Sequence, residues 1–216
     1  MDDGRVNALS PAMLAELDRA LDRAHADATV VVLSGRGGVF CAGFDLGVLK
    51  AGGEPAADMV RSGFMIAARL LAFPTPVVVA CTGHAFAMGA FLLLASDYRV
   101  GTLGAYTLVA NEVAIGLTMP HAAIAILRQR LTPAAFERAT LLAEPFDPPS
   151  AVAAGFLDQT VEPAAVAGTA QDVAHRLAGL DPVAHAATKA RARANTIDAL
   201  RQAIATDAAE MRARTS

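Results

Sequence analysis

The sequence predicts an α/β fold that ends in a helical region. Short β-branched runs alternate with amphipathic helical patterns up to about residue 162, whereas only helical patterns follow from Pro163 onward. Strand–helix alternation followed by a helical tail is typical of a parallel α/β core with a C-terminal helical extension. We therefore expect a core over residues 1–162 and a C-terminal helical region over residues 163–216.

Composition narrows the class of protein. The 216 residues can bury one large core, and the net charge of −3 argues against nucleic-acid or anionic-membrane partners. The longest apolar run, Ala85 to Ala95, is far shorter than the ~20 residues that span a bilayer. Two cysteines outside any CxxC pair exclude a disulfide framework. We expect a soluble, cytoplasmic protein without a signal peptide, with apolar surface available for oligomerisation.

The first half of the chain opens with a helix. Ser10 is a good N-cap and Pro11 suits the first helical position. Apolar residues then recur at helical spacing, at Met13, Leu14, Leu17 and Leu21. Thr29 to Leu33 is predicted to be a buried strand, and residues 34–38 form a turn.

The middle of the chain is divided by glycine and proline. Residues 47–58 contain Gly52-Gly53 and Pro55, and we expect a mobile loop there. A helix from about Ala56 to Ala72 is stopped by two prolines, and a buried strand follows at Val77–Cys81. The all-apolar residues 90–95 predict a helix that is buried on every side.

Further elements follow at short intervals. Strands are expected at residues 98–100, 106–109 and 157–161, and helices at 120–131, from 132 onward, and at 150–155. In the C-terminal region Asp181-Pro182 begins a helix.

Two small-residue turns stand out, each directly before a helix start. They are Val39 to Leu46 and His84 to Ala90. The first N–H groups of a helix lack intrahelical partners and lie at the positive end of its dipole. Two such groups converging on one point would form an oxyanion hole, which stabilises charge developing on a carbonyl oxygen.

Glu112 is a lone carboxylate in an apolar stretch. Its neighbours Val109, Ala110, Val113 and Ala114 should raise its pKa, as a general base near neutral pH requires. The alternative is a structural glutamate paired with an arginine.

Five motifs in order resemble the crotonase (enoyl-CoA hydratase/isomerase) superfamily over essentially the whole chain. They are Asn7-Ala8-Leu9-Ser10 (N-A-L-S), Phe40 to Leu46 (F-x-A-G-x-D-L), Val77 to Gly89, Ser96-Asp97-Tyr98-Arg99 (C-D-x-R in the family) and Ala151 to Val161. The resemblance implies a spiral of stacked strand–strand–helix units. It also implies an acyl-CoA site in residues 1–162, and a C-terminal region that serves oligomerisation and covers coenzyme A.

The resemblance also implies roles for individual residues. The main-chain N–H groups of Phe44 and Met88 would form the oxyanion hole. Ala42, Asp45 and Leu46 would lie along the bound coenzyme A, and Lys189 would reach its phosphates. Asp45 is in addition a good N-cap for the next helix. Family hydratases use two glutamates, and the first of these positions holds Phe91, which cannot transfer a proton but can line the acyl pocket.

The second glutamate position is Glu112, and Asn111-Glu112 with Gly116 is similar to the N-E-x-x-x-G pattern of single-glutamate Δ3,Δ2-enoyl-CoA isomerases. Three functions stay open: such an isomerase, a hydratase with one glutamate, and a catalytically silent acyl-CoA-binding protein. The resemblance implies a place in fatty-acid metabolism, an acyl-CoA thioester substrate, no metal or other cofactor, and a homotrimer or dimer of trimers.

Overall fold

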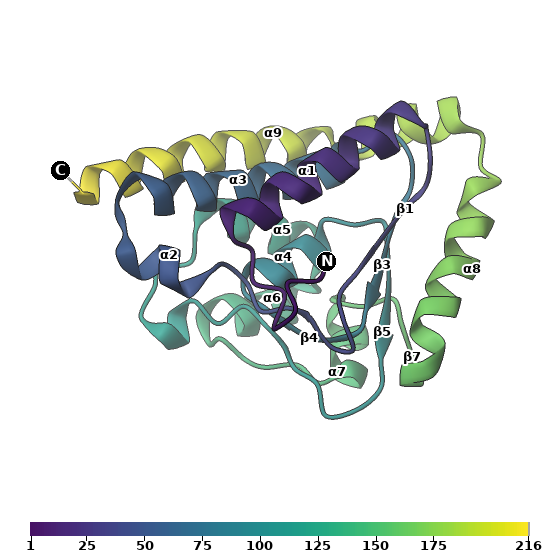
Figure 1. The fold of residues 1–216 in the computed structure, drawn as a ribbon, viewed down its shortest axis with the longest axis horizontal. Coiled ribbons are helices and arrows are strands. Elements are labelled where there is room, and N and C mark those ends of the chain that lie inside the picture. Colours follow the sequence, from purple (N-terminus) through teal and green to yellow (C-terminus); the bar gives the residue numbers. More distant parts are fainter. Residues whose placement is uncertain (216) are drawn as a thin grey trace.

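The computed structural model describes residues 1–215, which form two parallel β-sheets surrounded by helices (Figure 1). The first sheet has the strand order β1 (Val31–Ser34), β3 (Val77–Cys81), β5 (Tyr98–Thr102) and β7 (Gln159–Val161). The second has the order β2 (Gly38–Cys41), β4 (Gly83–Phe86) and β6 (Leu108–Val109).

Nine α-helices are present in the described residues: α1 (Pro11–Ala26), α2 (Leu46–Ala51), α3 (Gly53–Ala72), α4 (Met88–Leu94), α5 (His121–Arg130), α6 (Pro133–Leu141), α7 (Pro148–Ala154), α8 (Val166–Ala178) and α9 (Pro182–Thr215). Two short 3₁₀ turns, η1 (Val113–Ile115) and η2 (Pro163–Ala165), complete the elements. Among these residues no helix combines the length and apolar character that crossing a membrane requires.

The chain winds as a spiral. Successive strands alternate between the two sheets, so that β1, β3 and β5 stack in one sheet while β2, β4 and β6 stack in the other. Helices α2 and α3 follow β2, and α4 follows β4. This confirms the predicted spiral of strand–strand–helix units.

Strand β3 shows why the first sheet is apolar throughout. Its residues are all buried, with Val77, Val79 and Cys81 in the main core. Val78 and Ala80 face the opposite side and contact a second cluster that includes Val166, Ala170, Val173 and Ala174 of α8. A parallel sheet covered on both faces requires such continuous hydrophobic runs.

The C-terminal helices close the molecule, as predicted for a helical region from Pro163 onward. Helix α8 packs against the first sheet, and the long helix α9 lies along α3 and α5 (Figure 1, yellow). Residue 216 of the predicted region lies outside the described residues. The boundary at residue 162 and a role in assembly stay predictions.

Two predictions about local structure are wrong. Residues 47–58 are helical except for Gly52, which alone separates α2 from α3. The positive φ angles of Gly52 (68°) and Gly53 (66°) turn the chain between the two helices. Pro55 lies in the first turn of α3, where no N–H is needed. Strands β2 and β4 were expected as turns; both are short, begin with glycine, and are extended by pairing with each other.

Candidate active site

Three predicted catalytic groups lie at one edge of the second sheet. The strands β2, β4 and β6 are parallel neighbours, so their carboxyl ends meet at the same edge. Within three residues of these ends come Phe44 after β2, Met88 after β4 and Glu112 after β6. Open parallel sheets bind ligands at this edge.

The backbone around Phe44 is held by hydrogen bonds to Leu9. Leu9 N–H donates to the Gly43 carbonyl at 2.8 Å, and the Leu9 carbonyl accepts from Asp45 N–H at 3.3 Å. These bonds flank Phe44, whose own N–H therefore faces away from Leu9. No acceptor for it is found within residues 1–215.

The second turn presents Met88 in a similar way. Ala87 adopts a positive φ of 48°, which is strained for a residue with a side chain and recurs at functional sites. Its N–H donates to Val109 of β6 at 2.9 Å, so the turn is tied to the neighbouring strand. Met88 is the first residue of α4, and its N–H therefore has no intrahelical partner.

Gly43 shows how closely the two turns approach. A Cβ at this position would lie 3.1 Å from the Phe86 carbonyl oxygen and 3.7 Å from the Met88 nitrogen. Gly43 also has a φ of 89°, which favours glycine. The Gly43–Phe44 peptide, which carries the Phe44 N–H, thus lies close to the Ala87–Met88 peptide, which carries the Met88 N–H. An oxyanion hole requires two such N–H groups close together.

Asn7 supports the first turn and was missed as a site residue. It is fully buried, and its Nδ2 donates to the Val39 and Phe40 carbonyls, both at 3.1 Å. It thereby anchors the end of β2. The N-A-L-S motif was the signal that could have found it.

Glu112 is buried, with 7% of its surface exposed. Burial raises its pKa to about 7, against a smaller lowering by a backbone hydrogen bond. Its Oε2 is buried without a hydrogen-bond partner, as is Oδ1 of Asn111. No salt bridge to Glu112 occurs in the described residues, so the arginine-paired alternative finds no support. The predicted direction of the pKa shift is confirmed.

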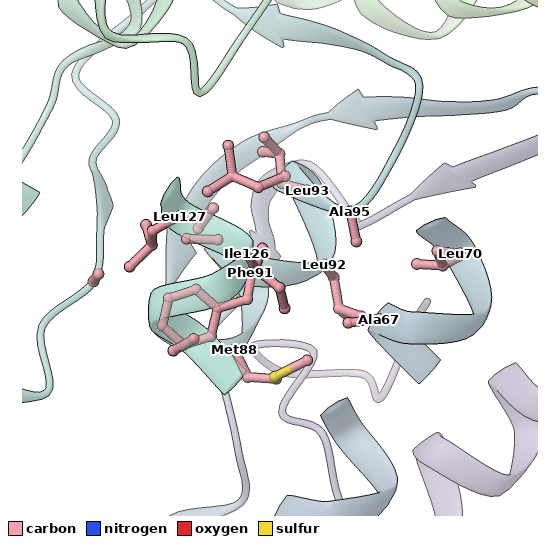
Figure 2. Close-up of a cluster of buried hydrophobic side chains, with 14 of the residues drawn as sticks. Ala67, Leu70, Met88, Phe91, Leu92, Leu93, Ala95, Ile126 and Leu127 are labelled. Atoms are coloured by element: carbon pink, nitrogen blue, oxygen red, sulfur yellow. The ribbon is translucent and has the colours of Figure 1, made fainter. Parts of the chain in front are cut away.

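The side chains of Met88 and Phe91 belong to the hydrophobic core. Figure 2 shows both within a cluster of buried apolar residues. The Phe91 ring stacks on Phe64 with ring centroids 6.0 Å apart, and Phe64 meets the edge of Phe44 at 6.3 Å. Phe91 therefore fills the space of the missing carboxylate with apolar surface, while a contact with the acyl chain stays a prediction.

Three residues beside the first turn were predicted to contact coenzyme A. Asp45 is the N-cap of α2, and its Oδ1 accepts from the N–H groups of Gly47 at 2.7 Å and Val48 at 3.2 Å. Leu46 is exposed and Ala42 is half-buried. Their contact with the coenzyme stays a prediction.

The structure corrects the prediction for Lys189. Its buried ammonium lies 2.6 Å from Asp97 Oδ2 and 3.4 Å from the Thr75 carbonyl oxygen. Arg193 contacts the other oxygen of Asp97 at 2.9 Å. Because its ammonium is buried against Asp97, Lys189 is a structural cation and does not present its charge to phosphates.

Two cavities do not include the predicted catalytic residues. One cavity of about 950 Å³ is lined by residues of α1 and α3, and another of about 490 Å³ by residues of β1 and α8. Neither is lined by Phe44, Met88 or Glu112.

His121 lies exposed beside Asp207 and Glu210 of α9. The candidate metal-ligating atoms of these three residues lie within 4.8 Å of one another. Asp207 accepts from the N–H groups of His121 and Ala122, both at 2.9 Å. It thus caps the start of α5, which is the structural role that these bonds establish.

Comparison with known proteins agrees with the geometry. A family model described as enoyl-CoA hydratase/isomerase matches residues 1–216. The structure is similar to an enoyl-CoA isomerase of Mycobacterium tuberculosis, with 51% identity, a TM-score of 0.93, and coverage of 97% of this chain and 92% of that one. It is equally similar to an enoyl-CoA hydratase of Mycobacterium marinum, with 49% identity, a TM-score of 0.94, and coverage of 98% and 93%.

A more distant structural relative is the human mitochondrial Δ3,Δ2-enoyl-CoA isomerase, with 29% identity, a TM-score of 0.92, and coverage of 99% of this chain and 85% of the human one. The family match over the whole chain and the spiral fold lead to the same conclusion. The protein has the crotonase fold and belongs to the enoyl-CoA hydratase/isomerase family of acyl-CoA enzymes.

Proposed function

We propose that this protein shifts the double bond of a 3-enoyl-CoA thioester to position 2. The observation that carries the proposal is Glu112, a buried carboxyl with an unpaired oxygen and a pKa raised to about 7. The other family position for a carboxylate holds Phe91, which is sealed in the core.

The reaction needs one base and one oxyanion site. The Glu112 carboxylate takes a proton from C2, and the electrons of that bond give a dienolate whose negative charge lies on the thioester oxygen. The N–H groups of Phe44 and Met88 stabilise this oxygen by hydrogen bonds. The protonated Glu112 then returns its proton to C4, the C2–C3 double bond forms, and the carbonyl is restored.

Hydration makes a larger demand on the site. A water must be held and deprotonated while a proton is delivered to the α-carbon, and family hydratases divide this work between two carboxylates. Glu112 alone suits the isomerisation, which moves one proton between two carbons of the same substrate. The similarity to two proteins described as isomerases supports this choice, although a second structure of the M. tuberculosis protein is described as a probable hydratase and the M. marinum relative as a hydratase.

The test is a paired assay of the purified protein with 3-enoyl-CoA and 2-enoyl-CoA thioesters of several chain lengths. We expect conversion of the 3-enoyl to the 2-enoyl isomer without accumulation of 3-hydroxyacyl-CoA. Glu112→Gln should lower kcat by at least about 10³-fold, since it removes the only base while keeping the shape of the side chain.

Three outcomes would contradict the proposal. Rapid formation of 3-hydroxyacyl-CoA from the 2-enoyl thioester would make the protein a one-glutamate hydratase. Binding of acyl-CoA with neither reaction would identify a silent binding protein. Full turnover by Glu112→Gln would remove Glu112 from the mechanism whatever the product.

A further inference from the structure

Gly63 in the middle of α3 faces the first turn of the site. A Cβ at this position would lie 2.4 Å from Cε1 and 2.6 Å from Cζ of the Phe44 ring. It would also lie 3.6 Å from Cγ of Met88. The end of the Phe44 ring thus occupies the space in which every other residue type would place its Cβ.

The Phe44 ring is enclosed by the same helix. Phe64, the next residue of α3, meets it edge-on with ring centroids 6.3 Å apart and an interplanar angle of 70°. Phe64 in turn stacks on Phe91 of α4. The backbone of Phe44 is held by the two Leu9 hydrogen bonds on either side of it. The orientation of the Phe44 peptide is therefore set by two contacts: the packing of its ring against Gly63 and the backbone hydrogen bonds to Leu9.

Glycine is a costly residue inside a helix, because it loses more backbone freedom than alanine and contributes no side-chain contact. At Gly168 in α8 a Cβ would meet nothing within 4 Å, so alanine fits there without a clash. At Gly63 the absent Cβ is replaced by an aromatic ring from the site. The two glycines therefore form a matched pair, one in contact with the site and one free of contacts.

We propose that Gly63 is a positioning residue for the oxyanion hole: it seats the Phe44 ring in α3 and thereby sets the direction of the Phe44 N–H. The inference rests on the proposed function, in which that N–H stabilises the enolate oxygen. An added methyl group displaces the ring, and the Gly43–Phe44 peptide turns against the Leu9 hydrogen bond to the Gly43 carbonyl, which misdirects the Phe44 N–H. Because the charge on the oxygen is greatest in the transition state, the loss appears in kcat more than in KM.

The experiment compares Gly63→Ala with Gly168→Ala as its matched control. Loss of one oxyanion-hole donor lowers kcat by about 10²–10³-fold, so we expect misdirection of the donor to lower it by about tenfold or more. We expect KM to change by less than about twofold and Gly168→Ala to retain the wild-type kcat. Wild-type kcat in Gly63→Ala would overturn the proposal.

Phe44→Leu supplies the second arm, because leucine keeps the main-chain N–H but lacks the ring atoms that meet the new methyl group. The double variant Phe44→Leu/Gly63→Ala should have the same kcat as the single variant Phe44→Leu. A further fall of tenfold in the double variant would overturn the proposal, since the effect would not then pass through the ring. This comparison remains available if Gly63→Ala alone is too unstable to assay.

A spectroscopic readout separates this inference from the proposed reaction. A 3-ketoacyl-CoA bound in an oxyanion hole gains enolate absorbance, which needs no turnover of a 3-enoyl substrate. We expect weaker enolate absorbance in Gly63→Ala than in Gly168→Ala at saturating thioester. If the wild-type protein shows enolate absorbance but isomerises no 3-enoyl thioester, the proposed function fails. The absorbance of Gly63→Ala relative to Gly168→Ala then still supports or overturns the role of Gly63.

Discussion

At the scale of the single residue, desolvation raises the pKa of Glu112. A carboxylate in water gains hydration that an apolar site cannot supply, so burial favours the neutral acid and raises the pKa to about 7. The unpaired Oε2 leaves the charged form without a compensating hydrogen bond at that oxygen. A carboxyl of this kind is a stronger base than an exposed glutamate and is still largely ionised just above neutral pH.

This pKa fixes the expected pH dependence. Only ionised Glu112 can accept the C2 proton, so kcat/KM for the 3-enoyl thioester should rise about tenfold per pH unit below pH 7 and level off above it. The measurement is a pH–rate profile from about pH 5 to pH 9. The exposed Glu137→Gln variant is the control and should keep the same acid limb. A profile that is flat across this range would mean that another group, or none, is the base.

Sequence reasoning worked for single residues where the relevant property is local. The raised pKa of Glu112 and the capping by Asp45 follow from near neighbours in the chain. Lys189 was misassigned because its partner Asp97 is 92 residues away. The contact of Gly63 with Phe44 also depends on how α3 packs against a loop, which no local pattern encodes.

At the scale of elements, Asp97 joins α9 to the first sheet. Its Oδ2 accepts from Val77 N–H of β3 at 2.7 Å, and its carboxylate contacts Lys189 and Arg193 of α9. Arg193 also donates to the Leu71 carbonyl at the end of α3 at 3.1 Å. Breaking one partner of a buried ion pair leaves the other charge uncompensated, which costs more than the pair itself contributes.

Lys189→Met should therefore reduce stability without affecting coenzyme binding. We expect its free energy of unfolding in urea to fall by about 1–3 kcal/mol, since Asp97 keeps one cation partner, while KM for the thioester stays within about twofold. Arg191→Ala, an exposed cation two positions along α9, is the control and should change neither quantity. A large rise in KM at unchanged stability would restore the phosphate-binding role that the sequence predicted.

Elements with continuous apolar runs were predicted well. Val77–Cys81 is a strand as expected, and α4 is buried on every side because all its residues are small or apolar. The strands β2 and β4 lie where the sequence predicts turns, because glycine has a low strand propensity. In the folded protein the pairing of these two strands with each other overrides that propensity. These two strands carry the candidate site, so its scaffold was not predicted from the sequence, while the roles of its residues stay predictions.

At the scale of the whole molecule, the site lies where the spiral leaves backbone groups unpaired. The second sheet has three strands, and the segments after β2, β4 and β6 all emerge at the same edge. The segment after β6 carries Glu112 and then an apolar stretch that faces outward. There Val113 is 44% exposed, Ile115 54% and Leu117 49%. Apolar residues this exposed beside a buried carboxyl indicate a surface that association can cover.

We predict that assembly as a homotrimer or dimer of trimers covers this surface. Wild-type protein should therefore show a mass three or six times that of the 22.2 kDa chain in light scattering after size-exclusion chromatography. Ile115→Asp should lower that mass by placing a charge in the interface. It should also admit water near Glu112, shifting the acid limb of the pH–rate profile toward lower pH. Val183→Asp, at an exposed apolar position on α9, is the control and should change neither the mass nor the acid limb. A monomeric wild-type protein with an unaltered acid limb in Ile115→Asp would mean that burial within a single chain alone sets the reactivity of Glu112.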